Sequence, residues 1–397
     1  MHKTKKISAL PALIAVLALI VCALVVGVFA DGGEAEEAVS RFYGTAWSLL
    51  PPVIAIVLAL ITKEVYSSLF VGILIFLVIL GAMVSLMNRA GGSAAFGRWA
   101  AKHIKTRVGA QLATTALGVL IFVDDYFNCL TVGSVMRPVT DKHGVSRAKL
   151  AYLIDATAAP VCIIAPISSW AAAVASYVED GQGLTLFIKS IPFNFYAWLT
   201  IIMMIGLAVM KIEYGPMAKF EANAKKGDLF SGKNPYAGME EDVPEGKGKV
   251  IDLVLPIVVL VFCCVMGMLY SGAFSTGTSW GTFGILIPIT LSVFPLTDPH
   301  GVVCVSACMA GAVCGDHCSP ISDTTIMASA GAQCDHVNHV STQLPYAITC
   351  AAVSCVSYIV AGFVPNAYIA LPVAILLMLG TLVVIKLINK GKVKNDA

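Results

Sequence analysis

Long apolar runs alternate with short polar connections along most of the chain. Each run holds about 20 residues, the length that an α-helix needs to cross a lipid bilayer. Backbone groups in lipid must satisfy their own hydrogen bonds, and nothing here alternates as a barrel strand does, so we predict an all-α polytopic membrane protein. The predicted spans are 7–30, 42–61, 65–87, 186–210, 250–274, 281–296, 346–364 and 371–388.

The composition strengthens this interpretation and excludes other classes of protein. Of the 397 residues, 58% are hydrophobic and only 13% are charged, which is unlike a soluble globular domain. The net charge of +2 is spread over short loops instead of forming a basic stripe, so we expect no nucleic-acid partner. The sequence has no nucleophile elbow, phosphate loop or dinucleotide fingerprint, and we predict neither an enzyme nor a cofactor.

The basic residues predict how the chain is oriented, because Lys and Arg accumulate in cytoplasmic loops. Acidic residues at 31–37 and 179–180 then lie on the outer side. We expect a multi-pass protein of the plasma membrane, the inner membrane of a cell that has two, with both termini in the cytoplasm. The basic segments are 1–6, 88–107, 137–149, 211–249 and 390–394.

This orientation conflicts with a simple count of spans in two places. Segment 108–136 joins two cytoplasmic loops but is too short for two crossings, which predicts a re-entrant hairpin broken near Asp124, Asp125 and Asn128. Upstream, three apolar runs separate two cytoplasmic segments, although an odd number of crossings cannot do so. Either one of these runs does not span the membrane, or a helix is missing.

Segment 211–249 is rich in Gly, Pro, Lys and Glu, and we interpret it as a solvated cytoplasmic linker between two transmembrane halves, 1–210 and 250–397. The motifs APISSW (165–170) and SPISDT (319–324) resemble each other across the halves. Each follows a hairpin candidate, FVDDYFNCLTVG or STGTSWGTFG, and each lies in a predicted broken helix, 150–178 or 302–330. This order is typical of an internally duplicated transporter with discontinuous helices.

Three aspartates lie beside prolines inside apolar segments: Asp155, Asp316 and Asp323. Proline removes a backbone donor and breaks the helix, which leaves carbonyl oxygens free in the membrane. Carboxylate, hydroxyl and carbonyl oxygens suit a hard cation such as sodium. We predict that the three aspartates form an ion and proton site, that Asp124, Asp125 and Asn128 line access to it, and that neutral ligands come from Thr157, Ser319 and Ser322.

A buried carboxylate favours its protonated form, so a proton and a sodium ion can compete for it. If the site opens to each side in turn, this competition produces exchange of sodium for protons. The same aspartates could instead only cap helices or accept structural hydrogen bonds. A different class of protein, a metal-binding structural or regulatory membrane protein, would use Cys314, His317 and Cys318, although their C-x3-C spacing has no matching second pair. His336 and His339 are expected at the membrane edge.

Three long motifs resemble the NhaC-type sodium/proton antiporter family: FVDDYFNCLTVGSVMRPVTDKHGVSRAKLAYLIDATAAPVCIIAPISSW, STGTSWGTFGILIPI, and AGAVCGDHCSPISDTTIMASAGAQCDHVNHVSTQLPYA. The resemblance extends over about 63–364. It implies an inner-membrane secondary antiporter with two inverted repeats, each containing a re-entrant hairpin and a broken helix. The implied partners are small inorganic ions, sodium and protons, and the lipid bilayer, and a homodimer remains an open alternative.

Proteins that resemble this family can instead exchange organic anions such as malate and lactate, or carry amino acids. A carboxylate substrate would need a nearby cation, for which Arg137 and Lys189 are the candidates. Members of the family look longer than this chain, which has abrupt joints near 71–72 and 272–275. We therefore predict a shortened member of the family.

Overall fold

The computed structural model describes residues 91–178, 182–232, 234–236, 248–252, 255, 258, 278–295 and 298–395, and these contain helices and no strands. The chain divides into two compact units, Met1–Phe76 and Leu77–Ala397, and every described residue belongs to the second. The predicted spans at 7–30, 42–61 and 65–87 lie outside the described residues. So do most of span 250–274 and both abrupt joints.

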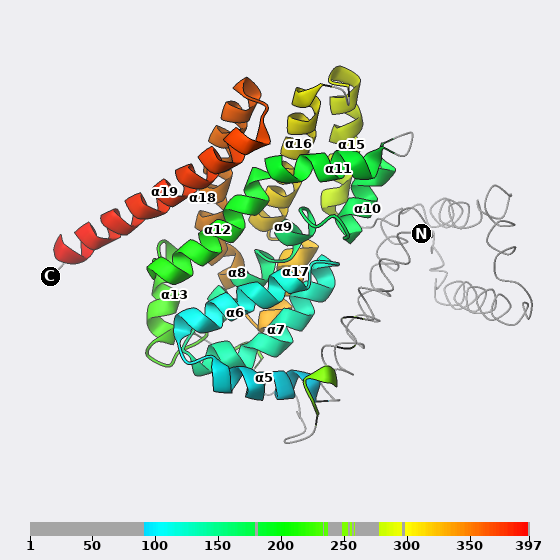
Figure 1. Cartoon of the computed structure of the whole chain (residues 1–397). Coiled ribbons are helices and arrows are strands. Elements are labelled where there is room, and N and C mark those ends of the chain that lie inside the picture. The colour runs from blue at the N-terminus through cyan, green and yellow to red at the C-terminus, as the bar shows by residue number, and fades with distance from the viewer. Residues whose placement is uncertain are drawn as a thin grey trace, which may run out of the picture. The chain divides into compact units, whose positions relative to one another are not determined.

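The described helices follow the chain in the order shown in Figure 1. They are α5 (Gly92–His103), α6 (Arg107–Leu120), α7 (Asp125–Lys142), α8 (Arg147–Asp155), α9 (Ala159–Cys162), α10 (Ser169–Ser176), α11 (Gly183–Ser190), η2 (Ile191–Phe193), α12 (Phe195–Met210), α13 (Pro216–Ala224), α15 (Thr278–Val293), α16 (Pro299–Cys318), α17 (Asp323–Ala332), α18 (His336–Phe363) and α19 (Ala367–Asn395).

Three helices in the described part of the chain are long and apolar enough to cross a membrane: Pro299–Cys318, His336–Phe363 and Ala367–Asn389. Gly183–Phe193 and Phe195–Met210 together form a fourth candidate, bent by 45°. Asn194 lies at the bend, where its side chain caps α12. With its many exposed leucines and isoleucines on α18 and α19, the fold is that of an all-α polytopic membrane protein.

Helices α6 and α7 form a hairpin at the position where the sequence predicts one. The hydroxyl of Thr106 accepts a hydrogen bond from the Gly109 N–H and so caps the start of α6. The helix ends at Leu120, and Asp124 caps α7 by accepting from the Phe127 N–H. The two helices pack against each other and against α8.

Both repeated motifs lie at helix breaks and start the next helix at the same motif position. In the first half, the break between α9 and α10 contains Pro166, and Ser168 caps α10 by accepting from the Ala171 N–H. In the second half, the break between α16 and α17 contains Pro320, and Ser322 is the N-cap residue of α17. The fourth residue of APISSW and of SPISDT is therefore in each case the residue before a helix.

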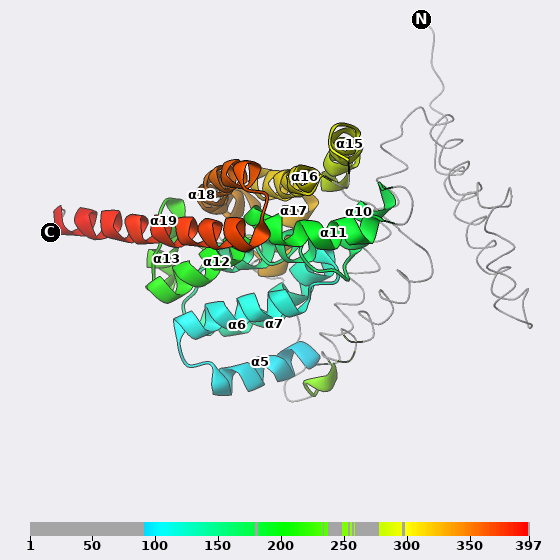
Figure 2. The ribbon, with the colours of Figure 1, turned by 45° about the horizontal axis from the view of Figure 1, so that its top comes forward.

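Helices α7 and α17 touch through their backbones. A Cβ atom added to Gly133 would lie 2.3 Å from the backbone of Gly331, and one added to Gly331 would lie 2.3 Å from the carbonyl oxygen of Cys129. Only glycine permits this approach. It brings the break at the start of α17 against the hairpin and α8. Figure 2 shows α16 and α18 beside each other, with α19 extending beyond them toward the C-terminus.

The segment interpreted as a solvated linker contains a packed helix, α13. Met217, Glu221 and Ala224 recur at helical spacing and are buried, and α13 packs against α8 and α18. The expectation of a solvated segment was wrong for these residues, because a glutamate was counted as a solvated group. Glu221 is buried as the partner of Arg107 and of the Ser146 N–H.

Candidate functional site

Asp155 lies at the centre of a buried polar cluster. It is the last residue of α8, and the short helix α9, which contains Pro160, begins four residues later. Its carboxylate is fully buried. Oδ2 accepts hydrogen bonds from Thr325 Oγ1 at 3.0 Å and from Gln343 Nε2 at 2.9 Å. Oδ1 has no hydrogen-bond partner among the described residues.

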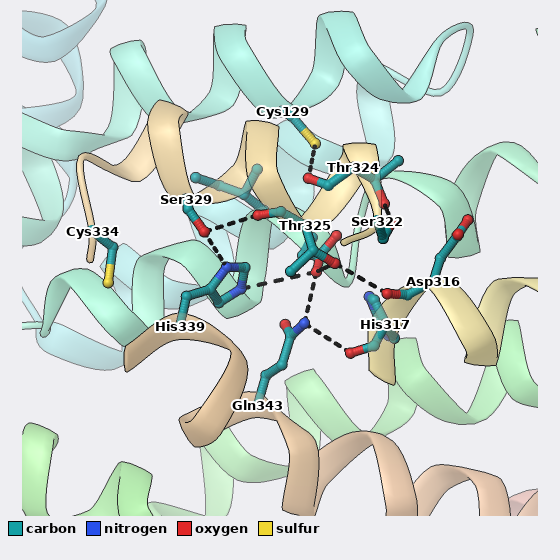
Figure 3. Close-up of polar contacts among 12 residues, drawn as sticks. Cys129, Asp316, His317, Ser322, Thr324, Thr325, Ser329, Cys334, His339 and Gln343 are labelled. Atoms are coloured by element: carbon teal, nitrogen blue, oxygen red, sulfur yellow. Dashed lines mark hydrogen bonds and ion pairs between the residues drawn. The ribbon is translucent and has the colours of Figure 1, made fainter. Parts of the chain in front are cut away.

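The second broken helix meets this cluster through the backbone ends of α16. The hydroxyl of Thr325 also lies 3.1 Å from the carbonyl oxygen of Asp316, and Gln343 Nε2 donates to the carbonyl oxygen of His317 at 2.9 Å. Carbonyls in the last turn of a helix have no partner within the helix. Here Gln343, which also contacts Asp155, satisfies the carbonyl of His317, and the Ser319 N–H donates to that of Asp316 at 3.1 Å. Figure 3 shows the side chains of Thr325, Gln343 and His339 directed toward the centre of the polar cluster.

His339 belongs to the same cluster, contrary to the expectation that it lies at the membrane edge. Its ring is fully buried, and its Nε2 is 3.9 Å from Asp155 Oδ2. Its Nδ1 is 2.8 Å from Ser329 Oγ, which also lies 2.8 Å from His336 Nδ1. His336 Nε2 in turn lies 2.6 Å from the carbonyl oxygen of Pro320 in the helix break.

A second polar group surrounds the start of α7 and contains Asp323. Asp125 Oδ2 accepts from Trp170 Nε1 at 3.0 Å, and Tyr126 OH donates to Asp323 Oδ2 at 2.6 Å. Asp124 accepts from a backbone N–H at 2.8 Å, as a capping residue does. By its hydrogen bonds, Asp323 therefore associates with the hairpin and not with Asp155.

The two groups are neighbours. Asp125 interacts electrostatically with Asp124, Asp316 and Asp323. The thiol of Cys129 is within electrostatic range of Asp155 as well as of Asp125 and Asp323. The structure thus brings all five predicted aspartates into one region. By their hydrogen bonds, Asp155 belongs to the first group and Asp124, Asp125 and Asp323 to the second. Asp316 contacts the first group through its backbone carbonyl, and its carboxylate interacts electrostatically with Asp125.

Asn128 ties helix ends together. Its Nδ2 is 2.7 Å from the carbonyl oxygen of Gly118, and 3.0 Å from those of Ile121 and Thr157. Its Oδ1 is buried without a hydrogen-bond partner in the described part of the chain. The Thr157 hydroxyl lies 2.9 Å from the carbonyl oxygen of Leu153 in the preceding turn, and Gly118 packs directly on it. Both side chains therefore fix the break after α8.

The two predicted serine ligands contact their own segment. Ser322 Oγ lies 3.0 Å from Thr324 Oγ1, and Ser319 Oγ accepts from the Ile321 N–H at 3.3 Å. Neither forms a described hydrogen bond to Asp155. Their role as ion ligands stays a prediction.

The rival metal site uses side chains in the last turns of α16. His317 Nδ1 lies 3.0 Å from Tyr196 OH, while Cys314 and Cys318 are half-buried one turn apart. Within the ranges that the structure describes, no three His, Cys, Asp or Glu side chains gather closely enough to hold a metal ion.

Sequence reasoning missed Thr325 and Gln343 and misplaced His339. A signal was present: His336, His339 and Gln343 follow one another at spacings of three and four residues, which places them along one face of α18. Thr325 and Ser329 have the same relation on α17. Polar residues that recur at helical spacing in an apolar segment indicate a buried polar face.

Buried carboxylates between interrupted helices of a membrane protein define a transporter of ions or small solutes. The chain belongs to the Na⁺/H⁺ antiporter family, a family of transporters and not of enzymes. The model of the Na⁺/H⁺ antiporter family matches residues 271–363, which include α15, α16, α17 and α18.

Three relatives add to this assignment. An uncharacterized protein of Haemophilus influenzae is 31% identical over 484 residues, which cover 81% of this chain and 92% of the relative. The alignment is longer than the covered part of this chain, so it contains gaps opposite residues of the relative. A malate-2H⁺/Na⁺-lactate antiporter of Bacillus subtilis is 30% identical over 107 residues, 26% of this chain and 21% of the relative.

An uncharacterized Na⁺/H⁺ antiporter of Haemophilus influenzae is 37% identical over 87 residues, which cover 22% of this chain and 19% of the relative. No solved structure matches. Family membership and the apolar helices establish a membrane transporter of the cation/proton antiporter type.

Proposed function

We propose that this protein is a secondary active transporter that exchanges sodium for protons across the cytoplasmic membrane, and that Asp155 is the carboxylate for which the two ions compete. The observation that carries this proposal is the environment of Asp155. The carboxylate is fully buried, two side chains donate to one oxygen, and the other oxygen has no hydrogen-bond partner among the described residues.

Such a carboxylate has two stable states. Two neutral donors offset only part of the cost of burying a negative charge, and a bare carboxylate oxygen in a low dielectric is a further cost. A proton on Oδ1 removes the charge, and a sodium ion beside Oδ1 balances it. The two ions exclude each other at this oxygen, so a site that opens alternately to the two sides exchanges one for the other.

Asp316 is a second member of this site. It is buried in the last turn of α16, and its own backbone carbonyl shares Thr325 with Asp155. Asp124, Asp125 and Asp323, with Asn128, form the wall through which ions reach Asp155. In this wall Asp124 also has the structural role of capping α7.

A second candidate function is transport of an organic anion or an amino acid coupled to sodium or protons. This function is favoured by the similarity to the malate-2H⁺/Na⁺-lactate antiporter, which extends over a short stretch of the chain. An anionic substrate needs a free cation in the site. Lys189 is exposed at the end of α11, and the buried Lys149 is paired with Glu213 at 3.0 Å. Counterflow of labelled malate or lactate in proteoliposomes would favour this alternative.

The proposed location is the plasma membrane, with multiple passes and both termini in the cytoplasm. The basic loops support this orientation. A reporter fused after Ala397 that is active only in the cytoplasm tests it: an inactive reporter in a fusion that is expressed and inserted contradicts the proposal.

The central experiment measures collapse of a pH gradient when sodium is added to proteoliposomes. Wild-type protein should respond to sodium, and Asp155→Asn should abolish the response while inserting normally, because the amide cannot take up and release a proton. Asp298→Asn is the matched control: Asp298 caps α16 in a half-exposed position, and asparagine caps a helix equally well. Unchanged exchange in Asp155→Asn removes this residue from the mechanism.

A further inference from the structure

We infer that Gln343 is a ligand of the transported cation and helps to set which cation is accepted. This inference rests on the proposed function, since it adds a residue to the Asp155 site. Gln343 lies on α18, outside both broken helices, two residues before Pro345, which lies inside this helix without ending it.

The hydrogen bonds of Gln343 fix the orientation of its amide. Nε2 lies 2.9 Å from Asp155 Oδ2 and 2.9 Å from the carbonyl oxygen of His317. A carbonyl oxygen only accepts hydrogen bonds, and so does an ionised carboxylate. The nitrogen must therefore face these two oxygens, and both of its hydrogens are used. The amide cannot be turned over without placing its oxygen against two other acceptors.

This orientation leaves the amide oxygen bare. Gln343 is only 1% exposed, and no described group forms a hydrogen bond of normal geometry with Oε1. The side chain also interacts with the ring of His339, and a cation at Oε1 takes the place of that contact. Buried side-chain oxygens are nearly always satisfied in folded proteins, so an exception calls for a functional explanation. Asp155 Oδ1 is the same kind of exception, and the two bare oxygens belong to groups joined directly by one hydrogen bond.

A cation explains both bare oxygens together. Carboxylate and amide oxygens are ligands that hard cations prefer, and both can take part in one coordination shell with the Asp155 charge. Gln343 then has two functions: its nitrogen holds Oδ2 and its oxygen binds the ion. Because Asp155 belongs to α8 and Gln343 to α18, which pack against each other, the ligand set depends on how these helices are placed.

A residue that only positions Asp155 gives a different result from one that binds the ion. Gln343→Asn keeps the amide but withdraws it by one methylene group, and Gln343→Leu removes both functions at similar volume. A ligand contributes differently to ions of different radius, so its displacement alters the ratio of the half-saturating concentrations of lithium and sodium. Loss of positioning alone lowers the maximal rates with both ions alike.

The experiment measures sodium- and lithium-dependent collapse of a pH gradient in proteoliposomes of the full chain, together with binding of ²²Na⁺ to purified protein. We expect Gln343→Leu to raise the half-saturating sodium concentration about tenfold or more, the effect of losing one buried polar interaction. Gln343→Asn should change the ratio of the half-saturating lithium and sodium concentrations about threefold or more, because it weakens one buried polar interaction without removing it. Ser354→Ala is the matched control, because Ser354 is buried on the same helix and donates to Cys350 within it.

The outcomes separate this inference from the proposed function. If wild-type responds to sodium and Asp155→Asn does not, but both Gln343 variants keep the wild-type half-saturation and ion ratio, Gln343 is not a ligand and the proposed exchange stands. Should Gln343→Leu not assemble, the ion ratio of Gln343→Asn decides alone. No sodium response in the wild-type protein overturns both.

Discussion

Asp155 and Asp316 lie at C-terminal ends of helices, whereas Asp124, Asp125 and Asp323 lie at N-terminal ends. A helix N-terminus offers free N–H groups and the positive end of the helix dipole, both of which stabilise a carboxylate. Asp124 accepts from the Phe127 N–H, and Asp323 Oδ1 accepts from the Thr324 N–H at 2.9 Å. These backbone hydrogen bonds favour the charged form of each carboxylate.

The C-terminal end of a helix has the opposite character. Its carbonyl oxygens and its negative dipole end repel a carboxylate. Asp155 receives donors only from side chains of α17 and α18 in the described structure, and its second oxygen receives none. Asp155 therefore lacks the backbone donors that Asp124 and Asp323 have. This contrast supports our proposal that Asp155 and Asp316 exchange ions while the N-terminal set lines the access to them.

The most direct test of this comparison neutralises, one at a time, the two aspartates on either side of the break between α16 and α17, because one belongs to each set. We expect Asp316→Asn to slow sodium-dependent proton flux about a hundredfold, the effect of losing about 3 kcal/mol at a charged group. Asp323→Asn should slow it about threefold or less, because asparagine can replace a carboxylate at a helix start. Flux into proteoliposomes, normalised to inserted protein, is the measurement. Equal losses, or a larger loss at Asp323, would contradict the distinction between helix ends.

A smaller effect is expected at the hydroxyl that joins the two broken helices. Thr325→Val keeps the shape of the side chain and removes the donor to Asp155 Oδ2. With one hydrogen bond to a charged group lost, the half-saturating sodium concentration should change about tenfold. Thr324→Val is the matched control, since that hydroxyl contacts Ser322 instead. A tenfold change in both variants would show that the effect comes from the helix start in general.

The sequence was sufficient to predict the helical breaks and the aspartates beside them. Proline, small residues and isolated charges in an apolar segment are local features, and Asp155, Pro166 and Pro320 can be found without knowing the partners of each segment. The family resemblance, drawn from the same motifs, agrees with the comparisons with known proteins. The interpretation as an all-α membrane protein follows from the length of the apolar runs.

The sequence could not assign each aspartate to its neighbours. Asp316 and Asp323 are seven residues apart and appear equivalent, but the break between them places one at the end of α16 and the other at the start of α17. The contact of Gly133 with Gly331 joins the halves at a position that no local pattern specifies. Thr325 and Gln343 reach Asp155 from 170 and 188 residues away, so only the tertiary structure shows that they contact it.

The smallest expected effect concerns an aspartate whose charge the fold already stabilises. Asp124→Ala removes the cap of α7 and should lower the free energy of unfolding by about 1 kcal/mol, while sodium-dependent flux per inserted molecule changes little. Asp124→Asn and Asp124→Ser should restore the stability, because each side chain can accept the Phe127 N–H. Thermal unfolding of the purified protein in detergent measures the first quantity and proteoliposome flux the second. If flux is lost in Asp124→Asn while stability is kept, the carboxylate itself takes part in ion transfer, and the N-terminal set is not only structural.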